Sequence, residues 1–343
     1  METENRVEHI SPRGVIGCLA AGFEMVGRNL LVVAVPVAVD LFLWLGPRVS
    51  VSPLVQSIAG YLRAQSSADP DIMGQMAQAT ELLEQVGSRF NLLSVVSGVP
   101  LLQVPSLLAR RGAGLGSPLS EPSVFSLSSP LALIPSWVGL ALVGLVIGFL
   151  YMNEIAHQVG LSGIASDLES EVTAGRKTVA DDGSIRSGIW KFLRFMLFAL
   201  GLLVIGLTVI PLWLLIVALG TVIVEPLGVL LWVAGVGFIG YGALHLIFVV
   251  PGILLGERPL HRAIGESMLL THLNLPPVLG LIVLAVVIYE GLGYAWSLPA
   301  NDSWALLVGI VGNAFVATSL TGAAFIFYRE RLAFARRLAL LGD

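Results

Sequence analysis

The chain has 343 residues, of which 56% are hydrophobic and only 12% are charged, and its formal net charge at pH 7 is -4. Soluble domains carry about 25% charged residues, so this composition argues against a soluble domain, and the mildly negative charge argues against nucleic-acid binding. Long apolar segments recur along the whole length, which predicts an all-α polytopic membrane protein.

Six segments are predicted to be transmembrane helices, because each is close to the roughly twenty apolar residues needed to cross the hydrocarbon layer. Together with interfacial amphipathic helices they form a single membrane domain over residues 1–343. In chain order the predicted spans cover residues 29–46, 131–152, 192–217, 226–255, 277–298 and 304–328.

Lysine and arginine residues fall mainly on one side of this six-span layout. Five of the 19 lie in the first long loop, at Arg48, Arg63, Arg89, Arg110 and Arg111. The other fourteen lie on the side that holds both termini, so we expect both termini in the cytoplasm. The expected location is the plasma (inner) membrane of a bacterial-type cell.

The first loop, residues 49–130, is too long to be a bare connector. Apolar residues from Ile72 to Phe90 recur at helical spacing, and a shorter amphipathic pattern runs from Leu54 to Leu62. We therefore expect a helical extracytoplasmic loop. One interpretation is an exterior cap that binds a partner chain, and the other is a helix pair packed on the outer face of its own bundle.

Residues 92–108 are uncharged and contain Pro100 and Pro105. A seventh span here would reverse the orientation of everything that follows and would expose the basic loop 153–191 to the outside. An interfacial or re-entrant segment keeps the charge distribution intact, so we favour that interpretation.

Two stretches echo each other. AAGFEMVGRNLL, from Ala20, and AIGESMLLTHLNL, from Ala263, each predict an interfacial helix followed by Asn-Leu and a span. RAIGES (262–267) and FIFYRERL (325–332) resemble the C-terminal part of the six-helix membrane domain attached to some bacterial glycerophosphodiester phosphodiesterases, and of related stand-alone bacterial membrane proteins. The resemblance implies a fold and a link to the cell envelope. It implies no catalytic residue, because that family's catalytic barrel is a separate soluble domain.

Three polar residues are predicted to share one layer of the membrane: Asp40 in the first span, Glu290 in the fifth and Asn313 in the sixth. No basic residue is expected at that depth. One hypothesis is a proton- or cation-coupled site. The other is a structural cluster, in which protonated acids are hydrogen-bonded to neighbouring polar groups.

Glu154 and His157 form an ExxH pair, and His245 lies in the inner half of the fourth span. This weak candidate metal or polar cluster lacks the second ExxH of a di-metal site, so interfacial polar residues satisfied by water and headgroups are the simpler hypothesis. No nucleotide-binding or hydrolase motif is found, and no cofactor is expected. The G-x-G-x-x-G at residues 235–240 and the pair Gly144 and Gly148 indicate close helix packing inside spans.

Basic residues flank the cytoplasmic ends of the predicted spans, and the tail 329–343 is predicted to be an amphipathic helix on the cytoplasmic leaflet. We expect anionic lipid headgroups to contact Lys191, Arg194, Arg329, Arg331, Arg336 and Arg337. Loop 153–191 has mixed charge and fits a solvated hairpin or a second docking segment for a partner membrane protein.

These patterns leave three functional hypotheses. The favoured one is a non-enzymatic structural or accessory subunit, in envelope or lipid homeostasis. The alternatives are a small transporter or permease that uses Asp40, Glu290 and Asn313, and an intramembrane lipid-modifying enzyme, which has the least support.

Overall fold

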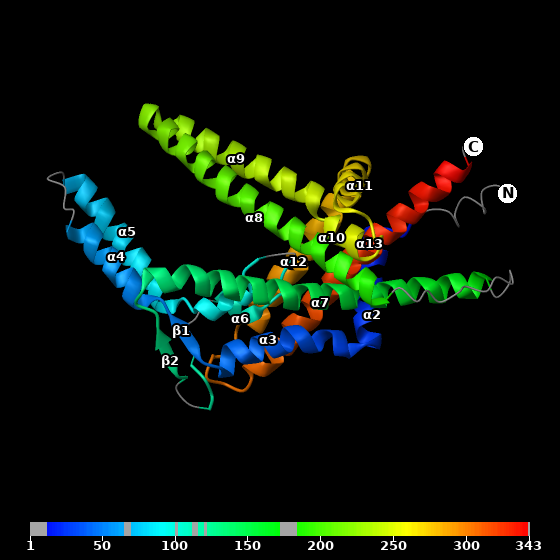
Figure 1. Cartoon of the computed structure of the whole chain (residues 1–343), viewed down its shortest axis with the longest axis horizontal. Helices are drawn as coiled ribbons and strands as arrows, with labels where there is room; N and C mark the ends of the chain where they lie inside the picture. The colour runs from blue at the N-terminus through cyan, green and yellow to red at the C-terminus, as the bar shows by residue number, and fades with distance from the viewer. Residues whose placement is uncertain are drawn as a thin grey trace. The chain divides into compact units, whose positions relative to one another are not determined.

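The computed structural model describes residues 12–64, 70–99, 102–111, 116–119, 122–171 and 184–341. Within these residues the protein is all-α apart from two three-residue strands, β1 (Arg48–Ser50) and β2 (Val124–Ser126) (Figure 1). In chain order the helices are α2 (Val15–Arg28), the 3-10 helix η1 (Leu30–Val33), α3 (Ala34–Leu45), α4 (Ser52–Ala64), α5 (Pro70–Arg89), the 3-10 helix η2 (Leu92–Ser97), α6 (Leu107–Arg111), α7 (Pro130–Glu171), α8 (Ser184–Ile223), α9 (Glu225–Leu246), α10 (Val249–Leu254), α11 (Leu260–Leu273), α12 (Leu275–Trp296) and α13 (Leu306–Leu341).

Several of the described helices are long and apolar enough to cross a membrane, which suggests a multi-pass membrane protein. A further candidate is the pair α2 and η1–α3, which is sharply bent at Asn29 and has the length and composition of either a broken span or a re-entrant loop. The other five candidates are Pro130–Leu161, Arg186–Ile223, Glu225–Leu254, Leu275–Trp296 and Leu306–Ala335.

The chain divides into two compact units. Unit 1 contains the described residues within Met1–Gly27, Met152–Leu284 and Ser319–Asp343, and unit 2 those within Arg28–Tyr151 and Ala285–Thr318. Helices α7, α12 and α13 therefore contribute residues to both units.

Unit 2 contains the organised part of loop 49–130. The amphipathic pattern between Ile72 and Phe90 lies almost wholly in α5, which runs beside α4 (Figure 1). Gly87 lets the two helices approach closely, because a Cβ there would lie within 2.7 Å of Val55. The strands β1 and β2 pair in parallel, with Arg48 opposite Val124.

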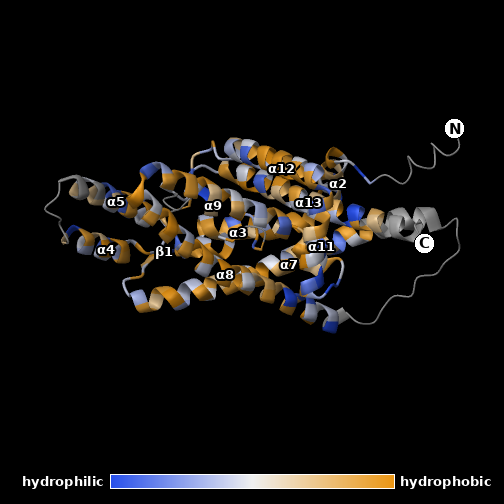
Figure 2. Cartoon of the chain, turned by 90° about the horizontal axis from the view of Figure 1, so that it is seen from above, coloured by the Kyte–Doolittle hydropathy of each residue, from blue (hydrophilic) through white to orange (hydrophobic). Residues whose placement is uncertain are grey.

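The α8–α9 hairpin in unit 1 is largely apolar beyond the first three turns of α8, and Figure 2 shows mostly hydrophobic residues near the α8 label. The turn at Val224 brings Trp213 against Trp232, with ring centroids 4.8 Å apart, and the Trp213 indole donates to the Leu231 carbonyl. Gly235 of the G-x-G-x-x-G sequence packs on the Trp213 ring. The motif is therefore part of a helix–helix contact, as the sequence predicts.

Helix α11 stabilises the break between α9 and α10. The Ser267 hydroxyl donates to the His245 carbonyl at 2.6 Å and accepts from the Phe248 N–H at 3.2 Å. The Thr271 hydroxyl donates to the Leu244 carbonyl. These bonds satisfy backbone groups that the interrupted helix leaves without partners. The two echoing stretches also share local structure, since α2 and α11 each have 14 residues and precede an Asn-Leu pair.

Candidate functional site

Asp40 is the central residue of the candidate site. Its side chain is 0% exposed and projects from α3. One carboxylate oxygen accepts from the Ser106 hydroxyl and from the Leu108 N–H at 3.1 Å, and the other accepts from the Leu107 N–H at 3.0 Å. The first N–H groups of a helix have no partner within the helix, so Asp40 caps the start of α6.

The donors to Asp40 belong to the predicted interfacial or re-entrant segment, whose described residues form two short helices and no continuous long helix. Its helical parts, η2 and α6, have 6 and 5 residues, and neither is long enough to cross a membrane alone. Leu92, Leu102 and Leu107 are buried. The segment therefore presents apolar side chains to its own unit while its interrupted backbone meets Asp40.

Gly144 and Gly148 on α7 hold this segment close. A Cβ on Gly144 would collide with the Val96 carbonyl, and one on Gly148 would collide with the Leu102 carbonyl. Gln103 adds a hydrogen bond to the Ala141 carbonyl of α7 at 3.2 Å. The glycine pair does allow a close approach, but its neighbour is an irregular segment rather than another long helix.

Glu290 has a cationic partner, so the expectation of no basic residue near it was wrong. The Arg110 guanidinium of α6 forms an ion pair with the Glu290 carboxylate and lies 4.4 Å from the centroid of the Tyr289 ring. The pair is accessible, because the Glu290 side chain is 59% exposed. Arg111 donates to the Asn301 side chain at 2.9 Å.

Asn313 behaves differently from both acids. Its side chain is 1% exposed, and neither its amide nitrogen nor its amide oxygen has a hydrogen-bond partner. Among the described residues no hydrogen bond joins Asp40, Glu290 and Asn313 to one another. Asp40 and Glu290 instead meet opposite ends of α6, which was not predicted.

The weak metal cluster is not assembled. Glu154 and His157 are exposed on α7, and Glu154 accepts from Gln158 at 2.7 Å. His245 is buried on α9, where its Nδ1 is 2.9 Å from the Tyr241 carbonyl oxygen. In the described part of the chain, no three metal-ligating side chains lie close enough together to hold a metal ion, so Glu154, His157 and His245 do not form such a group.

Several of the basic residues assigned to headgroups have protein partners. Lys191 pairs with Glu257 at 2.9 Å, and Arg194 donates to the Glu257 and Arg258 carbonyls. Arg329 donates to the Val159 carbonyl, and Arg331 lies over the Phe327 ring. The side chains of Arg336 and Arg337 lie outside the described residues.

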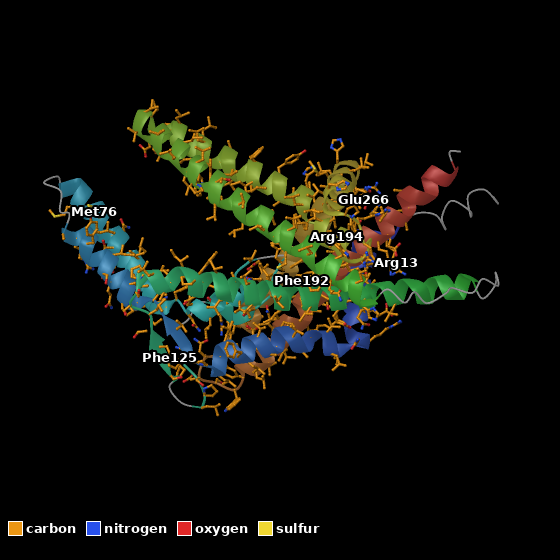
Figure 3. The ribbon with its side chains drawn as sticks, viewed as in Figure 1. Arg13, Met76, Phe125, Phe192, Arg194 and Glu266 are labelled. Carbon is orange, nitrogen blue, oxygen red and sulfur yellow. The ribbon has the colours of Figure 1, made fainter. Side chains whose placement is uncertain are left out.

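The two motifs that carry the family resemblance meet in unit 1. The Tyr328 hydroxyl donates to Glu266 at 3.0 Å, and the Arg258 Nε is 3.2 Å from the other oxygen of Glu266. Tyr328 is buried, and Gly252 leaves space for its hydroxyl. Glu266 is labelled on α11 in Figure 3. RAIGES and FIFYRERL are thus parts of one junction between α10, α11 and α13.

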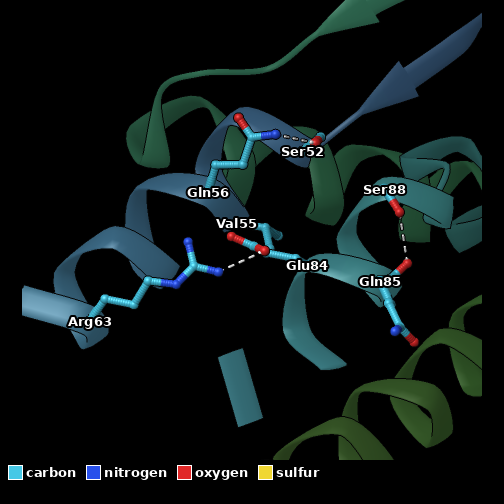
Figure 4. A pocket seen from close by; sticks show the side chains of 7 residues that line it. All are labelled: Ser52, Val55, Gln56, Arg63, Glu84, Gln85 and Ser88. Carbon is cyan, nitrogen blue, oxygen red and sulfur yellow. Dashed lines mark hydrogen bonds and ion pairs between the residues drawn. The ribbon is translucent and has the colours of Figure 1, made fainter. Parts of the chain in front are cut away.

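A pocket lies elsewhere in unit 2, between α4 and α5 (Figure 4). An ion pair at 2.9 Å between Arg63 and Glu84 crosses it. None of the candidate site residues predicted from the sequence lines this pocket. The residues that line it are Ser52, Val55, Gln56, Arg63, Glu84, Gln85 and Ser88, of which only Val55 is apolar.

The chain matches no protein-family model, no curated protein and no solved structure.

The sequence did not identify Ser106, Arg110, Glu257 or Tyr328 as partners of the polar residues. One local signal was present, since Ser106 precedes α6 and Arg110 follows an uncharged stretch. The pairings themselves join residues as far apart as Arg110 and Glu290, and no spacing rule reaches across such separations.

Proposed function

We propose that the protein is a structural or accessory subunit of a bacterial-type plasma membrane, with six spans and both termini in the cytoplasm. The observation that carries the proposal is the set of three donors on Asp40, all supplied by its own chain. A carboxylate that couples transport must bind and release a proton or a cation during the transport cycle. One that caps α6 has a structural role, holding the segment 102–111 in place.

The extracytoplasmic helices supply the surface for a partner chain. Helices α4 and α5 expose apolar side chains, including Ile58, Tyr61, Leu82 and Val86. Exposed apolar side chains outside a membrane favour an interaction surface. The resemblance of the junction motifs to an envelope-associated membrane domain supports a role in envelope or lipid homeostasis. In addition to their protein contacts, the basic residues near the cytoplasmic ends of the spans, including Arg329 and Arg331, are proposed to face the lipid headgroups.

Photo-crosslinking from position 61 tests the subunit role. A cross-linkable residue in place of Tyr61 should trap one membrane or envelope protein in fixed stoichiometry, and the same protein should remain bound through purification in mild detergent. Tyr61→Asp should release it. Gln78→Asp, which adds the same charge at an exposed polar position of α5, should not. A monodisperse monomer with no cross-linked partner would contradict the proposal.

Cysteine accessibility tests the topology in a Cys18→Ser background, because Cys18 is the single cysteine of the sequence and would otherwise react with the maleimide. A membrane-impermeant maleimide should label Gln78→Cys in intact cells and His261→Cys only after permeabilisation. Labelling of both, or the reverse pattern, would contradict the proposed orientation.

A second candidate, a small transporter or permease, is favoured by Asn313. A buried amide without protein partners is costly, and such groups mark solute or ion pathways in membrane proteins. If this is its function, liposomes containing the purified protein should show pH-dependent solute flux, which Asp40→Asn should alter. Unchanged, pH-independent flux in Asp40→Asn protein would remove Asp40 from any coupling role.

A further inference from the structure

The first three turns of α8 carry three hydrogen-bonding side chains on one face. Ser187, Lys191 and Arg194 are spaced four and three residues apart, which aligns them along the helix. All three contact the same turn between α10 and α11. Arg194 is labelled in Figure 3.

The turn places a carboxylate against these donors. Glu257 accepts from the Ser187 hydroxyl at 3.0 Å and pairs with the Lys191 ammonium at 2.9 Å. The Arg194 guanidinium donates to the main-chain carbonyls of Glu257 and Arg258. Two of the three donors thus meet the Glu257 carboxylate, and the third meets the main chain of the same residue. An ammonium, a guanidinium and a hydroxyl that lie this close together are a common donor set for phosphate groups.

The backbone of Glu257 is also unusual. Its φ of 51° lies in the left-handed region, which is unfavourable for a residue with a side chain. Non-glycine residues in such conformations cluster at ligand clamps and switch regions.

Exposure differs between the two members of the ion pair. The Lys191 side chain is 18% exposed, whereas that of Glu257 is 59% exposed. The carboxylate therefore lies on the solvent side of the ammonium, where an incoming anion can replace it. Exposed ion pairs contribute little free energy, so the exchange is easy. The neighbouring Arg258 is already paired with Glu266 and does not compete for Glu257.

We propose that Ser187, Lys191 and Arg194 form an anion site that the chain's own Glu257 occupies, and that the phosphate of an anionic lipid headgroup displaces this carboxylate. The lipid source rests on the proposed cytoplasmic placement of this face. The shared chemistry is a phosphate group, and free phosphate is the other source that the same donors accept.

The test measures phosphatidylglycerol binding to the full-length protein in detergent by native mass spectrometry, with phosphatidylcholine as the neutral lipid. Glu257→Gln removes the competing charge and keeps the side-chain shape, so it should strengthen phosphatidylglycerol binding about fivefold. Lys191→Gln should weaken it, both alone and combined with Glu257→Gln. Glu84→Gln is the matched control, because it removes a carboxylate from another exposed ion pair, with Arg63.

Three outcomes decide the proposal. Stronger phosphatidylglycerol binding in Glu257→Gln that disappears in the double variant supports it. Competition by inorganic phosphate in Glu257→Gln protein supports the site and identifies free phosphate as a ligand. Binding within twofold of the unmodified protein in both Glu257→Gln and Lys191→Gln overturns it. The Lys191→Gln result stands by itself if Glu257→Gln fails to fold, and neither result affects the cross-linking test at Tyr61.

Discussion

Asp40 of unit 2 and two glutamates of unit 1 are stabilised in opposite ways. In unit 2, Asp40 is fully buried, and its hydrogen-bond donors in the described part of the chain are a hydroxyl and two main-chain N–H groups. In unit 1, Glu257 and Glu266 are partly exposed and pair with Lys191 and Arg258. A buried carboxylate depends on every donor it has, because an unsatisfied buried group is costly. An exposed ion pair can be lost with little effect.

Asp40→Ala should be the most damaging substitution. It leaves the Ser106 hydroxyl and the N–H groups of Leu107 and Leu108 without their acceptor, and each unsatisfied buried donor costs about 1–3 kcal/mol. We expect a loss of about 3–5 kcal/mol, measured as a lower unfolding midpoint by tryptophan fluorescence in detergent. Asp40→Asn keeps one acceptor oxygen and should lose less.

Ser106→Ala provides the control for this prediction. It removes a hydroxyl that donates to Asp40 and accepts from the Ala109 N–H at 3.0 Å, but it keeps the carboxylate and both main-chain bonds to that carboxylate. Its cost should be about 1–2 kcal/mol, which is less than that of Asp40→Ala. Equal effects of Asp40→Ala and Ser106→Ala would show that the two main-chain bonds contribute nothing, and Asp40 would then resemble the exposed acids.

Gly148→Ala probes the support of the same segment from α7. Its Cβ would collide with the Leu102 carbonyl, a main-chain atom that cannot rotate away. Overpacking of this kind costs about 1–3 kcal/mol. The same unfolding measurement checks it. Gly139→Ala is the matched control on α7, since no neighbour lies within 4 Å of its added Cβ, and it should not lower the midpoint.

The sequence predicted the long helices well, because lipid or core contact requires apolar residues at helical spacing. The amphipathic pattern from Ile72 to Phe90 lies almost wholly in α5, and two of the long apolar runs lie in α8 and α12. It predicted that Asp40 needs partners but not which ones. The donors come from an irregular segment more than sixty residues away, and irregular backbone has no periodicity to recognise.

The same limit explains Glu290. A count of charges by depth assumed that loop residues stay at the surface, whereas α6 brings Arg110 back to α12. Asn313 marks the opposite case, because its burial in an apolar helix follows from the sequence while its lack of a partner does not. Sequence patterns thus predict which polar residues lie within apolar segments, but the partners of these residues are set by the tertiary structure.

Tyr328→Phe should have an intermediate effect. It removes one hydrogen bond to Glu266, while Arg258 continues to pair with that carboxylate, so we expect a loss of about 1 kcal/mol. A double-mutant cycle with Glu266→Gln would measure the coupling directly. Tyr241→Phe is the control, because the Tyr241 residue is exposed. Zero coupling would show that Tyr328 only fills space in the junction.

The smallest effect concerns the pH dependence of Glu257. The hydrogen bond from Lys191 is the main reason why its pKa is lowered from the ordinary value of 4.5, and Ser187 and the charges of Lys191 and Arg194 act in the same direction. The unfolded chain therefore binds the proton more readily than the folded one. The stabilising contribution is complete above about pH 4.5 and is lost as the pH falls through the lowered pKa of the folded state. Because Glu257 is largely exposed, the contribution should stay below about 1 kcal/mol.

Unfolding midpoints of the unmodified protein and Glu257→Gln should converge as the pH is lowered through this range. Midpoints that stay equally far apart at all pH values would show that the carboxylate's charge does not stabilise the turn, and the contrast with Asp40 would then rest on burial alone.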